Sequence, residues 1–345
     1  MLMSRIRVLV VDDSAYIRKV IKEMLGRSPD IEVVGAAREG QEALALVDTL
    51  RPDVITCDLI MPGMDGVEFI RRQMAIRPIP VVIVSIAGES SERVLSGLDA
   101  GAIDVVQKPS ALATEKVFDM ADDLILKVTA AAGAPLARLR DLPAQVPIPA
   151  RGPNLGRYKI VVMGVSTGGP QGLKSVIPLL PADCGVPIAI VLHMPIGYTE
   201  AYAERLSQNS PLTVLEAREG QDVVPGLVLV APGGRHLAFA READGRVVTR
   251  LDIRPLDTPH RPSVDVLFQS AAEVYGDGVL AVVMTGMGAD GREGAGWVKA
   301  RGGTVLTESE ETCVVYGMPR SVVEAGLSDE AVPLDRLAAA IMQRL

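Results

Sequence analysis

The sequence predicts two α/β domains, each a doubly wound parallel β-sheet covered by helices. Its 345 residues leave room for two domains of ordinary size. In both halves, short β-branched runs alternate with amphipathic stretches, which is typical of parallel sheets. Between the halves, residues 133–157 contain five prolines, which prevent a continuous helix or strand. We therefore expect a linker there, with domain boundaries at 1–126, 127–157 and 158–345.

The first half contains short apolar runs of strand length. They alternate with stretches whose apolar residues recur at helical spacing, so strands and helices are expected in turn. The expected strands are Ile6–Val11, Val33–Ala36, Val54–Cys57, Val81–Ser85 and Asp104–Val106. The expected helices include Ala15–Leu25, Gln41–Leu50 and Gly66–Ala75.

The second half repeats this pattern with longer connections. Its buried-strand candidates, which have helical stretches between them, are Lys159–Met163, Val186–Leu192, Leu227–Ala231 and Val279–Met284. A hairpin is expected near Leu237–Ile253, where Asp244 and Gly245 supply a turn between alternating residues.

The composition is that of an ordinary folded protein without a membrane segment. Hydrophobic residues make up 48% and charged residues 23% of the chain, which excludes a mainly disordered or coiled-coil protein. No apolar run approaches the roughly 18 residues of a membrane span, and the first residues lack a signal peptide's features. The net charge of −8, without a basic stripe, argues against a nucleic-acid partner. Three widely separated cysteines suit a reducing compartment, so we expect a cytoplasmic protein.

Three carboxylates follow two of the expected strands in the first half. Asp12 and Asp13 follow Ile6–Val11, and Asp58 follows Val54–Cys57. In a doubly wound sheet these strand ends meet at one edge. Crowded like charges repel unless a cation neutralises them, and oxygen ligands suit a hard ion such as Mg²⁺. Each acid could instead cap a helix or lie in a loop. The matching strand ends favour the metal site.

Two further polar residues follow strands of the same predicted sheet. Ser85 follows Val81–Val84, and Lys108 lies just beyond Asp104–Val106. A hydroxyl and an ammonium near a metal-bound carboxylate are the groups that a transferred phosphoryl group needs for its oxygens. The set therefore indicates phosphoryl transfer to a carboxylate.

Together with the segment MPGMDG at 61–66, these residues make the region 4–125 resemble a response-regulator receiver domain. The resemblance implies a flavodoxin-like fold and a histidine kinase as phosphodonor, with Asp58 as the phosphoacceptor. It implies Asp12, Asp13, Asp58 and the carbonyl of Ile60 as the Mg²⁺ site, Ser85 as the switch hydroxyl and Lys108 as the phosphate partner. Receivers often carry Tyr or Phe three positions before this lysine, and here the residue is Val105. The aromatic residue of the usual switch is therefore absent at this position.

A serine follows the first expected strand of the second half. The run Lys159–Met163 continues into GVSTGGP, which places Ser166 and Thr167 at the start of a helix. The serine could be only a helix N-cap. A dinucleotide-binding turn is disfavoured because Ser166 replaces the second glycine of its fingerprint. In the third interpretation Ser166 is a nucleophile, and the amides at the helix start stabilise an oxyanion.

A serine nucleophile needs a base, and the chain has three histidines. His193 directly follows the buried run Ala189–Leu192, so it should share the carboxyl edge of the sheet with Ser166. His236 and His260 lie beside glycine or proline and are more simply loop residues, although loops can also line a site. The separations between the three fit no zinc-ligand spacing. The pattern favours His193.

The acid that orients the base should also follow a strand. The run Val279–Met284 continues into TGMGADG, which places Asp290 at a turn and helix start. Asp265 is the main rival, but its predicted helix, Ser263–Val274, makes a surface position more probable. Asp290 could also be only an N-cap. A serine, a histidine and an aspartate that each follow a separate parallel strand favour a catalytic triad.

Six segments in order make nearly the whole chain resemble the chemotaxis response-regulator protein-glutamate methylesterases, the CheB family. They are GVSTGGP, LHMP, APGGRHL, HRPSVDVLF, TGMGADG and CVVYGMPR. The resemblance implies a Rossmann-like doubly wound α/β methylesterase domain. It implies Ser166 as nucleophile, His193 as general base, Asp290 as its orienter, and Thr167 and Met287 near the oxyanion and substrate. His260 and Arg261 fall in a matched segment without an assigned role.

The resemblance also implies the reaction. It predicts hydrolysis of glutamate methyl esters on methyl-accepting chemoreceptors, with release of methanol, and deamidation of receptor glutamines. Ester hydrolysis needs no cofactor. We expect that the unphosphorylated receiver covers the Ser166 site and that phosphorylation of Asp58 shifts the chain toward an open, active arrangement.

Two other functions fit the same residues. The esterase could act on a sensory receptor outside chemotaxis, because nothing in the sequence names a pathway. Alternatively, the chain could be a phosphorylation-controlled binding module that docks on receptors without catalysis. The presence of all three triad residues disfavours the second alternative.

Overall fold

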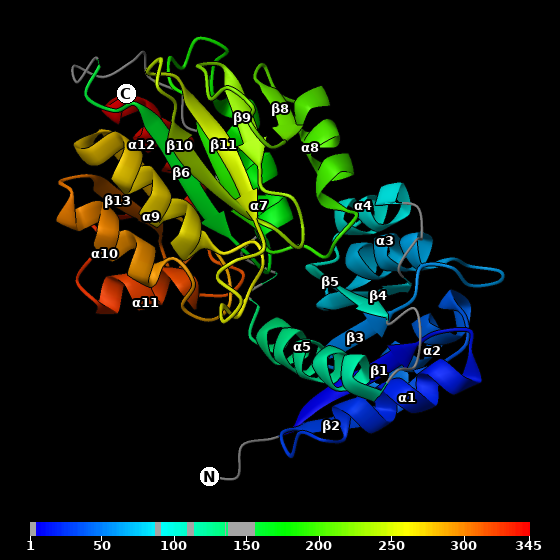
Figure 1. The fold of residues 1–345 in the computed structure, drawn as a ribbon. Helices are drawn as coiled ribbons and strands as arrows, with labels where there is room; N and C mark the ends of the chain where they lie inside the picture. The colour runs from blue at the N-terminus through cyan, green and yellow to red at the C-terminus, as the bar shows by residue number, and fades with distance from the viewer. Residues whose placement is uncertain (1–4, 87–90, 109–113, 135, 137–155) are drawn as a thin grey trace. The chain divides into compact units, whose positions relative to one another are not determined.

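The chain folds into two compact α/β units, Met1–Ala137 and Arg138–Leu345, in a computed structural model (Figure 1). The structure describes residues 5–86, 91–108, 114–134, 136 and 156–345. Most of the expected proline-rich linker lies outside these residues.

The first unit is a five-stranded parallel sheet with strands in the order β2-β1-β3-β4-β5. This is the flavodoxin-like order, whose ligand edge lies where β1 and β3 meet. Its elements are β1 (Ile6–Val11), α1 (Ala15–Leu25), β2 (Ile31–Ala37), α2 (Gly40–Leu50), β3 (Val54–Cys57), α3 (Gly66–Ile76), β4 (Val81–Ile86), α4 (Ser91–Asp99), β5 (Asp104–Lys108) and α5 (Thr114–Ala132).

Local capping explains where two of these helices begin. The side chain of Ser14 accepts a hydrogen bond from the N–H of Ile17 at the start of α1. Asp65 accepts one from the N–H of Glu68, at 2.9 Å, at the start of α3. Each cap satisfies a backbone donor that the first helical turn leaves without a partner, so the chain turns from strand end to helix within a few residues.

The second unit is a seven-stranded parallel sheet in the order β14-β13-β12-β6-β7-β9-β8. Its elements are β6 (Ile160–Val165), α7 (Gly169–Val176), η1 (Ile177–Leu179), β7 (Ile188–Leu192), α8 (Thr199–Gln208), β8 (Thr213–Glu216), β9 (Leu227–Val230), β10 (His236–Arg241), β11 (Val247–Asp252), α9 (Val264–Tyr275), η2 (Gly276–Gly278), β12 (Val279–Val283), α10 (Arg292–Ala300), β13 (Thr304–Glu308), α11 (Met318–Glu324), β14 (Glu330–Val332) and α12 (Leu334–Arg344).

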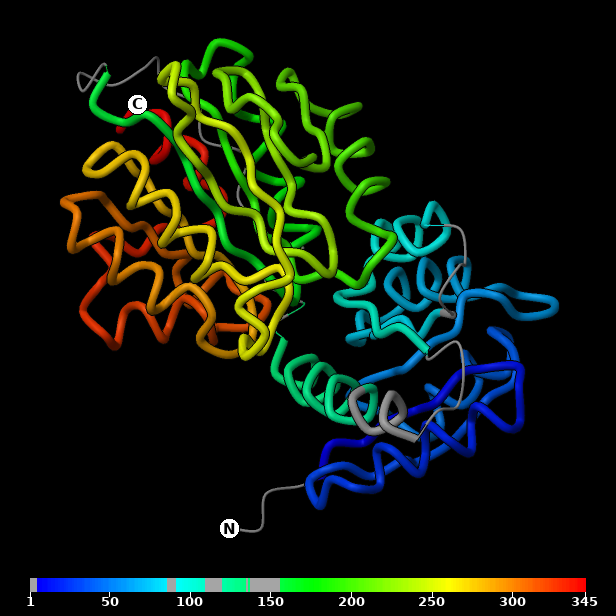
Figure 2. The backbone as a smooth tube through the Cα atoms, in the orientation of Figure 1, coloured from blue at the N-terminus to red at the C-terminus, as the bar shows by residue number. Residues whose placement is uncertain are grey.

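The central strands β6, β7 and β12 are buried along their whole length, as expected for parallel strands covered on both faces. The antiparallel hairpin β10–β11 and helix α9 share one apolar core with alternate residues of these strands. Figure 2 shows the hairpin passing in front of the sheet. The sheet grows from β6 in both directions, which makes the carboxyl end of β6 a topological switch point.

The structure departs from the expected elements in two places. Helix α5 continues to Ala132, so residues 127–132 are helical where the linker was expected to begin. The cause is local: alanines favour the helix, and the first proline comes only at position 135. Strands β8, β13 and β14 had no counterpart among the expected strands, because they are short and carry Thr or Glu at their ends.

Candidate functional site

Ser166 lies where β6 ends and the chain turns into α7. The ladder between β6 and β7 pairs Val165 with Leu192, so Ser166 and His193 are the next residues on two neighbouring strands. On the other side, the Ser166 N–H donates to the carbonyl of Thr285 at 3.0 Å. Gly168, with φ +79°, lets the backbone enter α7 in a conformation that other residues rarely adopt. Three segments distant in sequence thus meet at the serine.

His193 and Asp290 form a hydrogen-bonded pair at this edge. The ring Nε2 lies 2.8 Å from Oδ2 of Asp290, and both side chains are more than nine-tenths buried. An ionised carboxylate only accepts, so Nε2 carries the proton. The other ring nitrogen, Nδ1, is buried and has no hydrogen-bond partner among the described residues. Its lone pair is therefore available to take a proton.

Asp290 is held by the start of helix α9. Its carboxylate accepts hydrogen bonds from the N–H groups of Val264 (2.8 Å) and Asp265 (3.0 Å) and from the hydroxyl of Ser263 (2.9 Å). Burial by itself would raise the pKa of Asp290, but the hydrogen bonds from His193 and α9 outweigh it and hold that pKa well below its usual value. The acid stays ionised and opposite the imidazole.

Asp265 does not occupy the surface position that its helix suggested. Its carboxylate turns inward and accepts hydrogen bonds from the N–H groups of Gly291 (2.9 Å) and Gly294 (2.7 Å) at the start of α10. Burial and the nearby charge of Asp290 raise the pKa of Asp265 to about 7. The two aspartates therefore cap each other's helix: Asp290 caps α9 and Asp265 caps α10.

The remaining histidines are both closer to the site than the sequence indicated. The ring of His260 stacks on that of His193, with centroids 4.1 Å apart and planes 25° apart. His236 is the first residue of β10 and is buried, so its description as a loop residue is wrong. In the sequence, the segments APGGRHL and HRPSVDVLF were the signal that pointed to these two histidines. The spacing of residues along the chain does not reveal that two rings stack.

Thr167 and Met287 lie in the two loops that flank Ser166. Thr167 is buried, and its carbonyl accepts a hydrogen bond from the hydroxyl of Thr285 at 3.0 Å. Met287 follows Gly286, whose Cα faces Ser166 so closely that an added Cβ would lie 2.8 Å from the serine Cβ. Their expected roles near an oxyanion remain a prediction.

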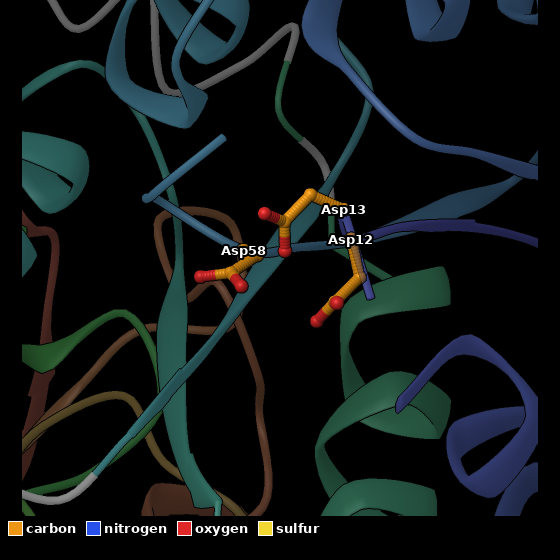
Figure 3. A group of neighbouring side chains, drawn as sticks. All are labelled: Asp12, Asp13 and Asp58. Carbon is orange, nitrogen blue, oxygen red and sulfur yellow. The ribbon is translucent and has the colours of Figure 1, made fainter. Parts of the chain in front are cut away.

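The acidic cluster of the first unit is also assembled. Asp12 and Asp13 follow β1 and Asp58 follows β3, and one carboxylate oxygen of each lies within 4.8 Å of the others (Figure 3). Lys108, at the end of β5, donates from Nζ to Asp12 and to Asp58 at 2.7 Å each.

The charges of this cluster suit an added cation. Burial raises the pKa of Asp12 above its usual value, although Lys108 opposes the rise. Burial also disfavours the charged form of Lys108, but the two carboxylates raise its pKa overall. With one ammonium against three carboxylates, all-oxygen donors and a buried Asp12, the residues present fit a hard divalent ion such as Mg²⁺.

Two strands of the first unit continue further than the sequence analysis expected, so Ser85 lies within β4 and Lys108 is the last residue of β5. Ser85, on β4, and Val105, on β5, are both buried. The N–H of Ile60 donates to a carboxylate oxygen of Asp58 at 3.3 Å, which leaves the carbonyl of Ile60 as the group expected to bind a metal. An added Cβ at Gly66 would lie 2.1 Å from the carbonyl oxygen of Asp58, so the loop after the acceptor packs tightly on α3.

Comparison with known proteins finds a family model for each half of the chain. Residues 161–341 match the family model described as CheB methylesterase, and residues 8–117 match the response regulator receiver domain. The chain belongs to the CheB methylesterase family.

Curated relatives in the CheB methylesterase family match along almost the whole chain. A protein-glutamate methylesterase/protein-glutamine glutaminase of Myxococcus xanthus is 48% identical over 99% of both chains. One from Geobacillus kaustophilus is 43% identical, again over 99% of both. The crystal structure of the Thermotoga maritima CheB methylesterase catalytic domain matches with a TM-score of 0.53 and 45% identity, over 55% of this chain and 99% of that chain. Among the residues described in this CheB family member, no helix is both long and apolar enough to cross a bilayer.

Proposed function

We propose that the chain is a phosphorylation-activated serine hydrolase that removes methyl groups from glutamate methyl esters on methyl-accepting chemoreceptors and deamidates receptor glutamines. The observation that carries this proposal is the His193–Asp290 pair, 2.8 Å apart, beside Ser166 on the neighbouring strand end. The full-length likeness to protein-glutamate methylesterase/protein-glutamine glutaminases supports the substrate class.

The geometry suits acyl transfer. Ser166 Oγ attacks the ester carbonyl while Nδ1 of His193 takes its proton, and Asp290 stabilises the resulting imidazolium. The imidazolium returns the proton to the leaving oxygen, so methanol departs and an acyl-serine remains. Water, activated by the same nitrogen, then releases glutamate and restores the serine. With a glutamine substrate, the same steps release ammonia instead.

The oxyanion of the tetrahedral intermediates needs backbone donors. We assign this role to the loops that carry Thr167 and Met287, which flank Ser166. The positive end of helix α7 lies at the same turn and favours negative charge there. These steps require no cofactor.

The first unit supplies control in this proposal. Asp58 accepts a phosphoryl group from a histidine kinase, with Asp12, Asp13 and the carbonyl of Ile60 as the metal-binding groups. When bound there, Mg²⁺ would neutralise phosphoryl oxygens. Lys108 would contact the phosphoryl group, and Ser85 would bind one of its oxygens as the switch hydroxyl. We propose a cytoplasmic location, which suits the three free cysteines.

Phosphorylation is proposed to relieve an inhibition by the receiver. Activation by a factor of 100 needs only about 2.7 kcal/mol of difference between the two states. We propose 1–126, 127–157 and 158–345 as receiver, linker and catalytic domain, with the end of α5, up to Ala132, forming the start of the linker. Deleting residues 1–150 should then raise basal hydrolysis, and an unchanged or lower rate would contradict the inhibition.

The deciding experiment measures methanol release from methylated chemoreceptor signalling fragments. Wild type and Ser166→Ala are compared with and without a small phosphodonor such as acetyl phosphate, and glutamine-bearing fragments are followed by mass for deamidation. The proposal expects release that rises with the phosphodonor and disappears in Ser166→Ala. Release that survives in the variant would exclude Ser166 as nucleophile. If no methylated chemoreceptor is hydrolysed, the substrate is a different ester or the chain only binds receptors.

A further inference from the structure

A buried histidine outside the proposed triad lies two contacts away from Asp290. His236 begins β10 and is 1% exposed. Its Nδ1 lies 3.1 Å from the backbone nitrogen of Ser263, and its Nε2 lies 3.1 Å from the carbonyl oxygen of Pro255. A backbone N–H can only donate and a carbonyl can only accept. The ring is therefore neutral, with its proton on Nε2 and the lone pair of Nδ1 directed at Ser263.

Ser263 connects this ring to the acid of the triad. It is the residue before α9, and its hydroxyl donates to Oδ1 of Asp290 at 2.9 Å. The next two N–H groups of the chain, at Val264 and Asp265, also donate to Asp290. Every hydrogen bond from α9 to the acid thus depends on where the chain enters the helix. At that entry point the Ser263 N–H donates to Nδ1 of His236.

We propose that His236 is a positioning residue: as a neutral imidazole it holds the Ser263 N–H, and through the start of α9 it keeps Asp290 oriented toward His193. The inference rests on the proposed triad for its consequence in catalysis. Its structural part, the tautomer and the contact with Ser263, stands without the triad.

Protonation would break the contact. A proton on Nδ1 would face the N–H of Ser263, so two donors would point at each other and the helix entry would have to move. The charged groups around the ring are Asp252 on the paired strand β11, Arg261 in the following loop, and Asp290. Burial, and to a smaller extent Arg261, lower the pKa of His236; the hydrogen bond to the Pro255 carbonyl and the two aspartates oppose this, but the pKa still lies below its usual value. The contact therefore persists at neutral pH and is lost only in acid.

Two substitutions test the two ring nitrogens of His236 separately. His236→Asn keeps an acceptor near the position of Nδ1 and cannot be protonated in this pH range. His236→Gln reaches the position of Nε2 but offers nothing to Ser263. We expect kcat for methyl ester hydrolysis to fall roughly tenfold in His236→Gln with little change in KM. The reason is that the Ser263 N–H loses its acceptor, and Ser263 in turn holds the charged Asp290. His236→Asn should recover most of that loss.

The pH dependence of kcat/KM provides a second test, because a purely structural role for His236 would not change it. Below the pKa of His236, loss of the contact should lower kcat/KM of wild type by a further factor of roughly ten, so log kcat/KM should fall more steeply than in His236→Asn over about one pH unit. In His236→Asn this extra drop should be absent. Ser263→Ala should lower kcat like His236→Gln, and Ser263→Thr should restore it.

Imidazole ¹⁵N NMR of the full chain tests the structural part directly, because there are only three histidines to resolve. The signals missing in His236→Asn identify His236, and the proposal expects the neutral Nε2–H tautomer at neutral pH. An Nδ1–H tautomer, or a charged ring at neutral pH, would overturn it. Equal kcat and equal acid slopes in wild type and both His236 variants would also overturn it. If Ser166→Ala hydrolyses the substrate like wild type, the proposed triad fails while the NMR result still decides the tautomer.

Discussion

Replacing Glu308 with glutamine should stabilise the second unit above neutral pH. Glu308 ends β13 and is completely buried, and its carboxyl accepts hydrogen bonds from the N–H of Thr285 (2.9 Å) and the hydroxyl of Thr312 (3.0 Å). Burial raises its pKa from 4.5 to about 7, although the hydrogen bonds oppose the rise. The folded chain therefore keeps a proton that the unfolded chain releases. Its contribution to stability is complete below pH 4.5 and is lost as the pH rises through about 7.

The magnitude follows from that difference in pKa. At about 1.4 kcal/mol for each pKa unit, the ionised carboxyl costs the folded state about 3 kcal/mol once the pH is well above 7. Glutamine has no such cost. Its side-chain oxygen can still accept the hydrogen bond from the Thr285 N–H. Its amide NH₂ can face the hydroxyl of Thr312, which can instead donate to the carbonyl of Ser309, 3.4 Å away. The variant should therefore lose the pH-dependent penalty and keep the packing.

The assay is urea unfolding followed by fluorescence of Trp297, the single tryptophan, which lies in α10 of the second unit. Wild type and Glu308→Gln are compared at about pH 5 and about pH 8, and Glu310→Gln is the control at an exposed carboxyl nearby. Asp265 also titrates near 7, but it does so in all three proteins and cancels in the difference. A stability difference between wild type and Glu308→Gln that is the same at both pH values would refute the reasoning.

Three further predictions concern the two sites. Gly286→Ala should lower kcat by at least about tenfold in a folded protein, because the added Cβ would lie 2.4 Å from Sδ of Met318 and 2.8 Å from the Cβ of Ser166. Wild-type methanol release with unchanged circular dichroism would contradict this. His260→Ala should lower kcat severalfold because the ring that stacks on His193 at 4.1 Å is lost, and His260→Phe should restore part of it. Equal rates in both variants would show that stacking is irrelevant. Lys108→Met should lower the melting temperature without metal, because Asp12 and Asp58 lose their shared ammonium, and should increase the stabilisation by Mg²⁺. Thermal unfolding with and without Mg²⁺ checks it, and equal stabilisation of both proteins would contradict it.

The sheets could be predicted from the sequence because their apolar runs are local and unambiguous. Runs such as Ile6–Val11 and Val279–Met284 match strands of the structure at nearly every residue. Strands at the edges of the second sheet were not predictable in this way. Thr213–Glu216 and Glu330–Val332 become strands because a neighbouring strand offers its backbone, which is a tertiary effect.

The pairing within the proposed triad could be anticipated for a related reason. Parallel strands bring their carboxyl ends to one edge, so residues that follow strands, such as His193, meet there whatever the loops do. The contacts that loops make could not be predicted from the positions of the strand ends. The stacking of His260 and the inward turn of Asp265 depend on how α9 and α10 pack on the sheet, and no periodicity in the sequence encodes that packing.

Under the proposed triad, the exchange of caps between α9 and α10 makes the orientation of Asp290 depend on complete folding of both helices. Asp290 gains its three donors only when α9 is docked, and α10 gains its cap from Asp265 only in the same arrangement. If either helix detaches, the acid opposite His193 loses its orientation. In the proposed mechanism, a nascent or partly opened chain would therefore hydrolyse no ester until both helices have docked.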